Sequence, residues 1–323
     1  MNYLINFKKS FDKEINSYVD KKIRYADDID PKSSLILKII KEFINNGGKR
    51  FRPALFYFAY RSYSNKDLKE ILKLSFVFEF IQTFILIHDD IIDNSDLRRG
   101  KSTVHKKYDI STAILAGDMA LMLADEIFYS FSHKKEIIYL YNELKQELLI
   151  GEYLDTIKIE DVIKIMELKT ARYSFIKPVF IALSLADVNS KIIEKWTKFL
   201  KEIGILFQMK DDFEGLFGEE KNIGKPVDSD IKEGKQTLLI QQLLKRINQN
   251  EKKRFNSFFG KKTIATEDFR WLKKTMMKYK IPSHFQQEII RRSEKIKKNI
   301  DIFFPKKEIT KLINEILDKI IYF

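Results

Sequence analysis

The sequence predicts an all-α fold, and three features of its composition support this prediction. Proline and glycine are scarce, with 6 and 11 residues among 323, so few positions break a helix. Long stretches rich in Lys, Glu, Leu and Ile favour helix along the whole chain. No Ser-rich or Pro-rich linker divides the chain, and 44% of its residues are hydrophobic. We therefore predict one domain, residues 1–323, with a sizeable core.

The N-terminal third is predicted to consist of amphipathic helices. Apolar residues recur at helical spacing between Ile36 and Ile44. Gly47-Gly48 breaks this pattern, and Pro53 suits the first turn of the next helix. The elements predicted here are one or two helices in 1–45, helices at 54–63 and 67–93, and a polar loop at 94–108.

The rest of the chain is predicted to stay helical, with Gly117-Asp118 within or at the start of a helix. The segment from Gly215 to Lys235 has four glycines and a proline among charged residues, so it is the longest non-helical candidate. Breaks are expected near His133, Thr156, 187–190, Gly260, Pro282 and Pro305.

Cysteine is absent, which excludes disulfides, thiolate nucleophiles and Cys-ligated metal sites. The four histidines, His88, His105, His133 and His284, include no pair at the i, i+4 spacing of a helical zinc site. Any metal is therefore expected to be a hard cation bound by carboxylates.

The formal net charge is +13, from 59 Lys and Arg against 46 Asp and Glu. This excess suits nucleic acid, an acidic membrane surface or a phosphorylated substrate, and equally a lysine-rich solubilising surface. No signal peptide is expected, because the first residues lack an apolar core and a small-residue cleavage site. The stretch Phe76–His88 carries Glu79 and Gln82 and falls short of a membrane span, so we predict a cytoplasmic protein without a transmembrane segment.

The first acidic motif ends a strongly apolar helix. Asp89 and Asp93 lie one turn apart on the same face, with Asp90 beside them. Such carboxylates repel one another near a helix C-terminus unless a cation lies between them. Arg98 and Arg99 follow, and guanidinium groups suit phosphate oxygens as carboxylates suit Mg²⁺. A simpler interpretation is that these arginines only form salt bridges with Asp93 or Asp96.

The second acidic motif lies 122 residues later and has the same design. An apolar helix again delivers paired aspartates, Asp211 and Asp212, with Gln208 one turn before Asp212. Two acidic helix ends facing one another across a cavity could hold several Mg²⁺ ions around one diphosphate. The Gly/Lys-rich segment with Lys225 and Lys235 follows, and it is either a lid over this anion or an ordinary charged loop.

With these elements in this order, the chain resembles the trans-isoprenyl (polyprenyl) diphosphate synthases from about residue 15 to the C-terminus, most like short-chain geranylgeranyl and farnesyl diphosphate synthases. Each motif is weak alone, but their number, order and spacing together are specific. They are 47–53 (GGKRFRP), 89–93 with Arg98-Arg99-Gly100, Gly117-Asp118, Lys169-Thr170-Ala171, Phe207-Gln208 with Asp211-Asp212, and Gly224-Lys225 with Gly234-Lys235 and Thr237.

The resemblance implies an isoprenoid-synthase-type helical bundle around a central cavity, a homodimer, and Mg²⁺ as the cofactor with three ions per active site. The implied reaction condenses isopentenyl diphosphate with dimethylallyl, geranyl or farnesyl diphosphate, and the departing diphosphate serves as the base. The implied metal ligands are Asp89, Asp90, Asp93, Asp211 and Asp212.

The remaining roles are also implied by the resemblance. The residues for isopentenyl diphosphate are Lys49, Arg52, Gln82 and Arg99, and Gln82 shares a helical face with Asp89, seven residues on. The residues for the allylic diphosphate are Arg98, Lys169, Lys225 and Lys235. Lys169, Thr170 and Gln208 are the implied catalytic residues, the last two placing oxygen dipoles near the allylic cation. Packing between subunits is expected near Phe76–Leu86 and 110–125.

The chain departs from the family pattern at Gly215, where many relatives have a third aspartate, at Glu152, where a Gln is common, and at Asp228. Phe84 and Ile85, just below Asp89, are the expected chain-length residues, and their combination resembles archaeal geranylgeranyl synthases. We expect a C20 product, with C15 as the alternative.

The departures also leave a catalytically silent subunit as an alternative. A class I terpene cyclase or a squalene-type synthase would lack the sites for a second diphosphate. A nucleic-acid-binding protein would not explain two acidic clusters, so no nucleic-acid partner is expected.

Overall fold

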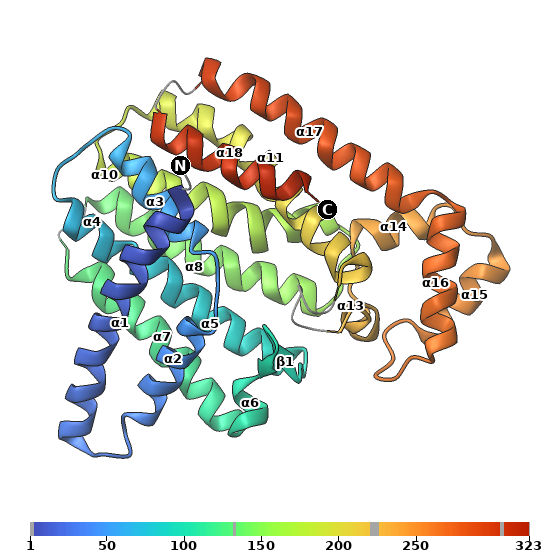
Figure 1. The fold of residues 1–323 in the computed structure, drawn as a ribbon, viewed down its shortest axis with the longest axis horizontal. Coiled ribbons are helices and arrows are strands. Elements are labelled where there is room, and N and C mark those ends of the chain that lie inside the picture. Colours follow the sequence, from blue (N-terminus) through green and yellow to red (C-terminus); the bar gives the residue numbers. More distant parts are fainter. Residues whose placement is uncertain (1–2, 132–133, 220–225, 304–306, 323) are drawn as a thin grey trace.

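Helices make up nearly all of the regular structure of this protein, as the computed structural model shows for residues 3–131, 134–219, 226–303 and 307–322 (Figure 1). The all-α prediction is therefore confirmed. In these described ranges the helices are α1 (Tyr3–Ile29), α2 (Leu35–Asn45), α3 (Phe51–Arg61), α4 (Leu68–Leu74), α5 (Phe76–Ile92), α6 (Val104–Lys107), α7 (Ile110–Tyr129), α8 (Lys135–Thr156), α9 (Val162–Ile165), the π-helix η1 (Met166–Ile176), α10 (Lys177–Leu185), α11 (Ser190–Phe217), α13 (Ser229–Glu233), α14 (Leu238–Leu244), α15 (Gln249–Phe258), α16 (Thr266–Lys278), α17 (Ile281–Phe303) and α18 (Lys307–Ile321).

The central helix of the bundle is α5, which is apolar on nearly all sides. Phe80 and Ile81 are fully buried, and α5 packs along α7. A helix that is hydrophobic all round belongs inside a protein. One cluster of buried apolar residues runs from Leu4 in α1 to Ile320 in α18, which agrees with a single domain, although the domain organisation stays a prediction.

The segment Leu68–Ile92 is apolar and long enough to cross a membrane by composition alone, and it is the one such segment in the described residues. In the structure 72% of its apolar window is buried inside the bundle. Burial therefore identifies α4 and α5 as core helices of this fold.

The π-helix η1 lies between α8 and α11, and a glycine stands at each crossing. A Cβ atom on Gly151 of α8 would lie 2.8 Å from the backbone nitrogen of Lys169. A Cβ atom on Gly204 of α11 would lie 2.4 Å from Cα of Ala171. Both glycines thus let the wide π-helix approach its neighbours closely, and π-helical segments are frequent at functional sites.

Several predicted boundaries need correction. The helix predicted at 67–93 is divided at Ser75 into α4 and α5. The loop predicted at 94–108 contains a short antiparallel hairpin, β1 (Leu97–Arg98) and β2 (Lys101–Ser102), followed by α6. The break expected near Pro282, however, is present, since α16 ends at Lys278 and α17 begins at Ile281, and Pro282 itself lies in the first turn of α17, where its missing N–H is not needed.

Other boundaries are confirmed. The breaks at Thr156, 187–190 and Gly260 are present, and Gly117-Asp118 lies within α7. By contrast, the segment from Gly215 to Lys235 that was predicted to be non-helical contains the end of α11 and the short helix α13, so this prediction is wrong for those stretches. His133, Pro305 and Lys225 lie outside the described residues.

Candidate active site

A cavity of about 640 Å³ lies where the acidic ends of α5 and α11 approach η1 and the hairpin. Most of the predicted site residues line it, although they come from distant parts of the chain. They are Lys49, Arg52, Gln82, Ile85, Asp89, Asp93, Arg98, Arg99, Lys169, Thr170, Gln208, Asp211, Asp212 and Lys235. Of the other predicted residues, Asp90 and Phe84 are not among the described residues that line this cavity, and Lys225 is not described.

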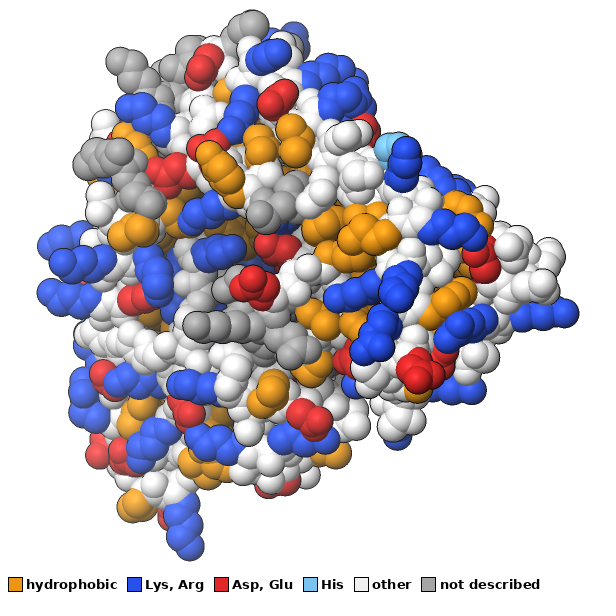
Figure 2. All heavy atoms as spheres, turned by 45° about the vertical axis from the view of Figure 1, so that its right-hand side comes forward, with side chains coloured by type: hydrophobic (Ala, Val, Ile, Leu, Met, Phe, Trp, Pro, Cys, Tyr) orange, Lys and Arg blue, Asp and Glu red, His pale blue; other side chains and the backbone are white. Residues whose placement is uncertain are grey.

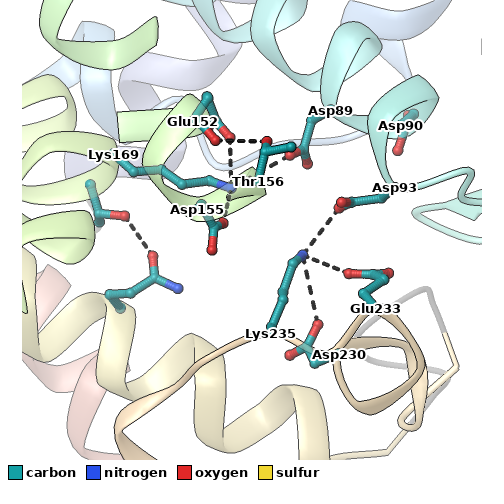
Figure 3. Close-up of polar contacts among 12 residues, drawn as sticks. Asp89, Asp90, Asp93, Glu152, Asp155, Thr156, Lys169, Asp230, Glu233 and Lys235 are labelled. Carbon is teal, nitrogen blue, oxygen red and sulfur yellow. Dashed lines mark hydrogen bonds and ion pairs between the residues drawn. The ribbon is translucent and has the colours of Figure 1, made fainter. Parts of the chain in front are cut away.

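Lys169 extends from η1 into a group of three carboxylates (Figure 3). Its Nζ lies 2.7 Å from Glu152 Oε2 and 2.8 Å from Asp155 Oδ2, both on α8. It also lies 3.5 Å from Asp89 Oδ1. Burial alone would lower the pKa of Lys169, but the three carboxylates raise it above its usual value, so the side chain stays an ammonium.

Lys235 forms a second group of the same kind on the opposite side of the cavity (Figure 3). Its Nζ lies 2.8 Å from Glu233 Oε2 and 3.1 Å from Asp93 Oδ2. Asp230 Oδ1 is 3.9 Å away. Burial opposes the charge of Lys235, but Asp230 and Asp93 raise its pKa well above the usual value.

The two groups leave the cavity wall with excess negative charge. In each of them one ammonium faces three carboxylates, and a protein interior screens such charges poorly. The arrangement therefore attracts further cations into the cavity.

Asp90 has a different environment from its neighbours in the first motif. It is 1% exposed and accepts a hydrogen bond of 2.7 Å from Nε of Arg98. Burial raises the pKa of Asp90 to about 6, while Arg98 opposes this rise. Arg98 also donates from Nη2 to Asp89 Oδ2 at 3.2 Å. In this structure Arg98 thus binds Asp89 and Asp90, whereas the simpler interpretation of the arginines expected Asp93 or Asp96 as the partner.

The second motif is tied to η1 by a chain of hydrogen bonds. The hydroxyl of Thr170 donates to Gln208 Oε1 at 2.5 Å, and Gln208 Nε2 donates to Asp212 Oδ1 at 2.8 Å. Burial raises the pKa of Asp212 to about 8, an effect that the Gln208 hydrogen bond opposes. Asp211 is exposed on the cavity wall.

Gly215 leaves room for a carboxylate from another element. A Cβ atom on Gly215 would lie only 2.6 Å from Oδ2 of Asp230, which belongs to α13. The Asp230 carboxylate therefore occupies the space over Gly215 that a side chain at this position would need.

The cationic side of the cavity is built from the loop before α3 and from the hairpin. Arg99 and Gly100 form the two-residue turn of the hairpin, with φ of 53° and 75°. Positive φ at both positions is the condition for a tight hairpin turn. This turn sends Arg98 toward Asp90, while the Arg99 side chain packs over Gly47 and Gly48.

Arg52 and Gln82 meet at Tyr173 of η1. The Arg52 guanidinium lies 4.8 Å from the Tyr173 ring centroid and donates from Nε to Ser174 Oγ at 2.9 Å. The Tyr173 hydroxyl donates to Gln82 Oε1 at 3.0 Å, which leaves the Gln82 amide nitrogen as a donor toward ligands. Burial lowers the pKa of Arg52, but an arginine remains charged.

Part of the cavity wall is apolar, and Ile85 belongs to it. The apolar side chains that line the cavity include Phe51, Ile85, Leu86, Leu97, Leu148, Val162, Ile165, Met166 and Phe207. Phe84 instead is buried and packs edge-on against the His88 ring, with ring centroids 4.8 Å apart. Of the two expected chain-length residues, only Ile85 therefore reaches this cavity.

The side chains fit a magnesium site in their chemistry, since all predicted ligands are carboxylates. Asp90 Oδ2 is buried without a hydrogen-bond partner among the described residues, which leaves a lone pair for a cation. In the described part of the chain, no three Asp, Glu or His side chains already stand close enough to hold a metal ion. The lysines stand between the carboxylates, so a metal ion would enter as these ion pairs rearrange.

Sequence reasoning missed part of the site. Asp230 and Glu233, which hold Lys235, were not selected, because their proximity depends on the fold of α13. Tyr173 was missed although a signal was present: it follows Lys169 by four residues and shares its helical face.

On the face shown in Figure 2, Lys and Arg side chains are scattered, with Asp and Glu side chains between them. On that face the distribution resembles a solubilising surface more than a single basic patch.

Comparisons with known proteins agree with this architecture. A family model described as polyprenyl synthetase matches residues 33–276. A short chain isoprenyl diphosphate synthase from Methanocaldococcus jannaschii is 34% identical over 269 residues, which cover 80% of this chain and 81% of that protein. A geranylgeranyl diphosphate synthase from Saccharolobus solfataricus is 33% identical over 248 residues, 73% of this chain and 74% of that protein.

A solved structure is similar over nearly the whole length. The geranylgeranyl pyrophosphate synthase from Corynebacterium glutamicum, complexed with isoprenyl diphosphate and magnesium, has a TM-score of 0.88 and 26% identity. The match covers 98% of this chain and 99% of that one.

The fold and the cavity define an all-α enzyme of the prenyltransferase class, as predicted. The chain belongs to the polyprenyl synthetase family.

Proposed function

We propose that the protein condenses isopentenyl diphosphate with allylic diphosphates of 5 to 15 carbons and releases geranylgeranyl diphosphate, with farnesyl diphosphate as the alternative product. The observation that carries this proposal is the cavity, in which acidic groups from α5, α8, α11 and α13 face cations and an apolar interior. This combination suits a substrate with a charged head and a hydrocarbon tail.

The allylic diphosphate is assigned to the acidic rim. Asp89, Asp90, Asp93, Asp211 and Asp212 are the proposed holders of magnesium. Bound magnesium would supply Lewis-acid stabilisation to the departing diphosphate. Arg98, Lys169, Lys225 and Lys235 are the proposed cations for its oxygens; the three described ones now contact carboxylates and would exchange some of these contacts for phosphate.

Isopentenyl diphosphate is assigned to the cationic side, with Lys49, Arg52, Gln82 and Arg99 as the proposed ligands. Arg52 and Gln82 are fixed by hydrogen bonds to η1, so they are preorganised. The Tyr173 hydroxyl and the Ser174 hydroxyl provide this support.

The proposed reaction breaks the C1–O bond of the allylic substrate, and the electron pair leaves with the diphosphate. The double bond of isopentenyl diphosphate then attacks C1, and the proton lost in forming the new double bond passes to the diphosphate. Cations fixed around the departing group lower the barrier. The apolar wall would exclude water from the allylic cation, and the oxygens of Thr170 and Gln208, which line the same cavity, are proposed to stabilise it.

Incubation of the purified chain with radiolabelled isopentenyl diphosphate, Mg²⁺ and C5, C10 or C15 primers tests this function. Labelled prenyl diphosphate is the expected product. Absence of transfer by the chain alone would instead support a catalytically silent subunit.

Chain length gives a specific prediction. Ile85→Phe is expected to shift the main product from C20 to C15, because it adds bulk to the apolar wall. Ile85→Leu is the matched control and should keep the wild-type product. The product of Phe84→Ala is analysed in the same way, to decide whether Phe84 also limits product chain length from behind this wall. An unchanged chain length would show that it does not.

The proposed homodimer is supported by exposed apolar side chains on α7 and α8. Leu115 and Met122 of α7 and Ile150 and Tyr153 of α8 are each more than half exposed. By contrast, Phe76–Leu86 is largely buried within the chain, so the expectation that it packs across subunits is wrong. Light scattering after gel filtration should give twice the chain mass, and Met122→Glu with Tyr153→Glu should halve it. A cytoplasmic location stays a prediction.

A further inference from the structure

The loop between α2 and α3 carries Lys49 but has no regular structure of its own. Gly47 and Gly48 both have φ of 100°, a conformation that other residues rarely adopt. Two successive glycines give a chain much conformational freedom. Side-chain contacts must therefore hold Lys49 in place beside Arg52.

The Arg50 side chain links the two ends of this loop through hydrogen bonds. Its Nη2 donates to the carbonyl oxygen of Ile44, at the end of α2, at 2.5 Å. Its Nη1 donates to the carbonyl oxygen of Gly47 at 2.8 Å. One guanidinium thus joins the last turn of the helix to the middle of the loop.

Two carboxylates hold the guanidinium in turn. Nη1 of Arg50 lies 2.6 Å from Glu79 Oε1 on α5, and Nε lies 2.7 Å from Asp12 Oδ1 on α1. The Arg50 side chain is only 1% exposed. A buried charge of this kind depends on its partners, and only arginine has a planar fork with enough donors for all four acceptors.

The guanidinium also fills the space against the glycines. A Cβ atom on Gly48 would lie 2.6 Å from Arg50 Nη1 and 3.3 Å from Arg99 Nη2. The loop is therefore packed between two guanidinium groups. All the described hydrogen bonds of Arg50 go to acceptors within the protein, whereas Lys49 is exposed on the cavity wall.

We propose that Arg50 is a positioning residue for isopentenyl diphosphate, acting through the loop that presents Lys49 beside Arg52 of α3, and that Asp12 couples the N-terminal helix to this site. The inference rests on the proposed function and extends it to α1, which precedes the family match at residues 33–276. Displacement of a binding group by about 1 Å can cost orders of magnitude in rate, so a fixed loop matters.

The test separates the two substrates. Arg50→Lys keeps the charge but cannot reach all four acceptors, so the KM for isopentenyl diphosphate is expected to rise about fivefold or more. The KM for the allylic substrate and kcat should stay within about twofold of wild type. Asp12→Asn should raise the same KM about two- to threefold.

Asp20→Asn is the matched control. Asp20 also lies on α1 and pairs with Lys41 of α2 at 2.5 Å, but it does not touch the loop. It should leave both KM values unchanged. If Arg50→Lys does not fold, the comparison of Asp12→Asn with Asp20→Asn decides the question.

A lower melting temperature with unchanged KM values would show a purely structural role and overturn the inference. An equal rise in KM for both substrates would also overturn it. Failure of the proposed function is distinguishable, because the wild-type chain would then transfer no prenyl group at all.

Discussion

Asp89→Asn is expected to lower kcat/KM at least about a hundredfold, the usual size of effect when one charged group of a preorganised site is removed. The Asp89 carboxylate lies on the cavity wall between Arg98 and Lys169. The amide has no charge with which to hold a divalent cation. The Mg²⁺ concentration for half-maximal activity should therefore rise as well, which a titration of the rate with Mg²⁺ measures.

Asp96→Asn is the control for this prediction. Asp96 is a neighbour of the same motif, but its side chain is 80% exposed and pairs with Lys106 at the surface. Exposed ion pairs contribute little, so both rate and Mg²⁺ dependence should stay near wild type. Wild-type turnover by Asp89→Asn, or equal losses in both variants, would contradict the proposed metal site.

Gly215→Asp, which restores the third aspartate of the second motif, is expected to lower kcat at least about tenfold instead of improving it. The new Cβ would lie 2.6 Å from Asp230 Oδ2, and a second carboxylate beside Asp230 would repel it. Asp230 must then move away, which removes one of the three carboxylates around the Lys235 ammonium and changes the charge at this side of the cavity. Steady-state kinetics of the purified variant measure this loss.

Two further variants identify the cause. Gly215→Ala adds the Cβ without the charge and should lose less. The double variant Gly215→Asp/Asp230→Ala has one carboxylate, on α11 at position 215, and none at position 230. It should recover part of the activity lost in Gly215→Asp, and a double-mutant cycle measures this coupling. If Gly215→Asp were as active as wild type, Asp230 would not occupy the space above Gly215.

The sequence predicted the helical fold for clear physical reasons. Helix propensity and apolar spacing are local properties, so α5 and the helices around it followed from composition and periodicity. The two acidic motifs were recognisable because paired aspartates at an apolar helix end, such as Asp89 and Asp93, are costly without a cation. Resemblance of the motifs then led to the family, which the comparisons confirmed.

Less local features escaped prediction. The hairpin at Leu97–Ser102 lies in a segment that the sequence predicts to be a loop, because two-residue strands leave no periodic pattern. The adjacent arginines Arg98 and Arg99 contact different partners. Arg98 lies in the first strand of the hairpin, whereas Arg99 lies in its turn, where φ is positive at Arg99 and Gly100.

By itself the sequence determined the class of fold, the two carboxylate motifs and the family of the protein. Only the tertiary structure decided which groups meet: Asp230 over Gly215, Asp12 against Arg50, and Ile85 but not Phe84 on the cavity wall. The reason is physical. Helix formation depends on near neighbours along the chain, whereas these contacts join side chains whose distance is set by how whole helices pack.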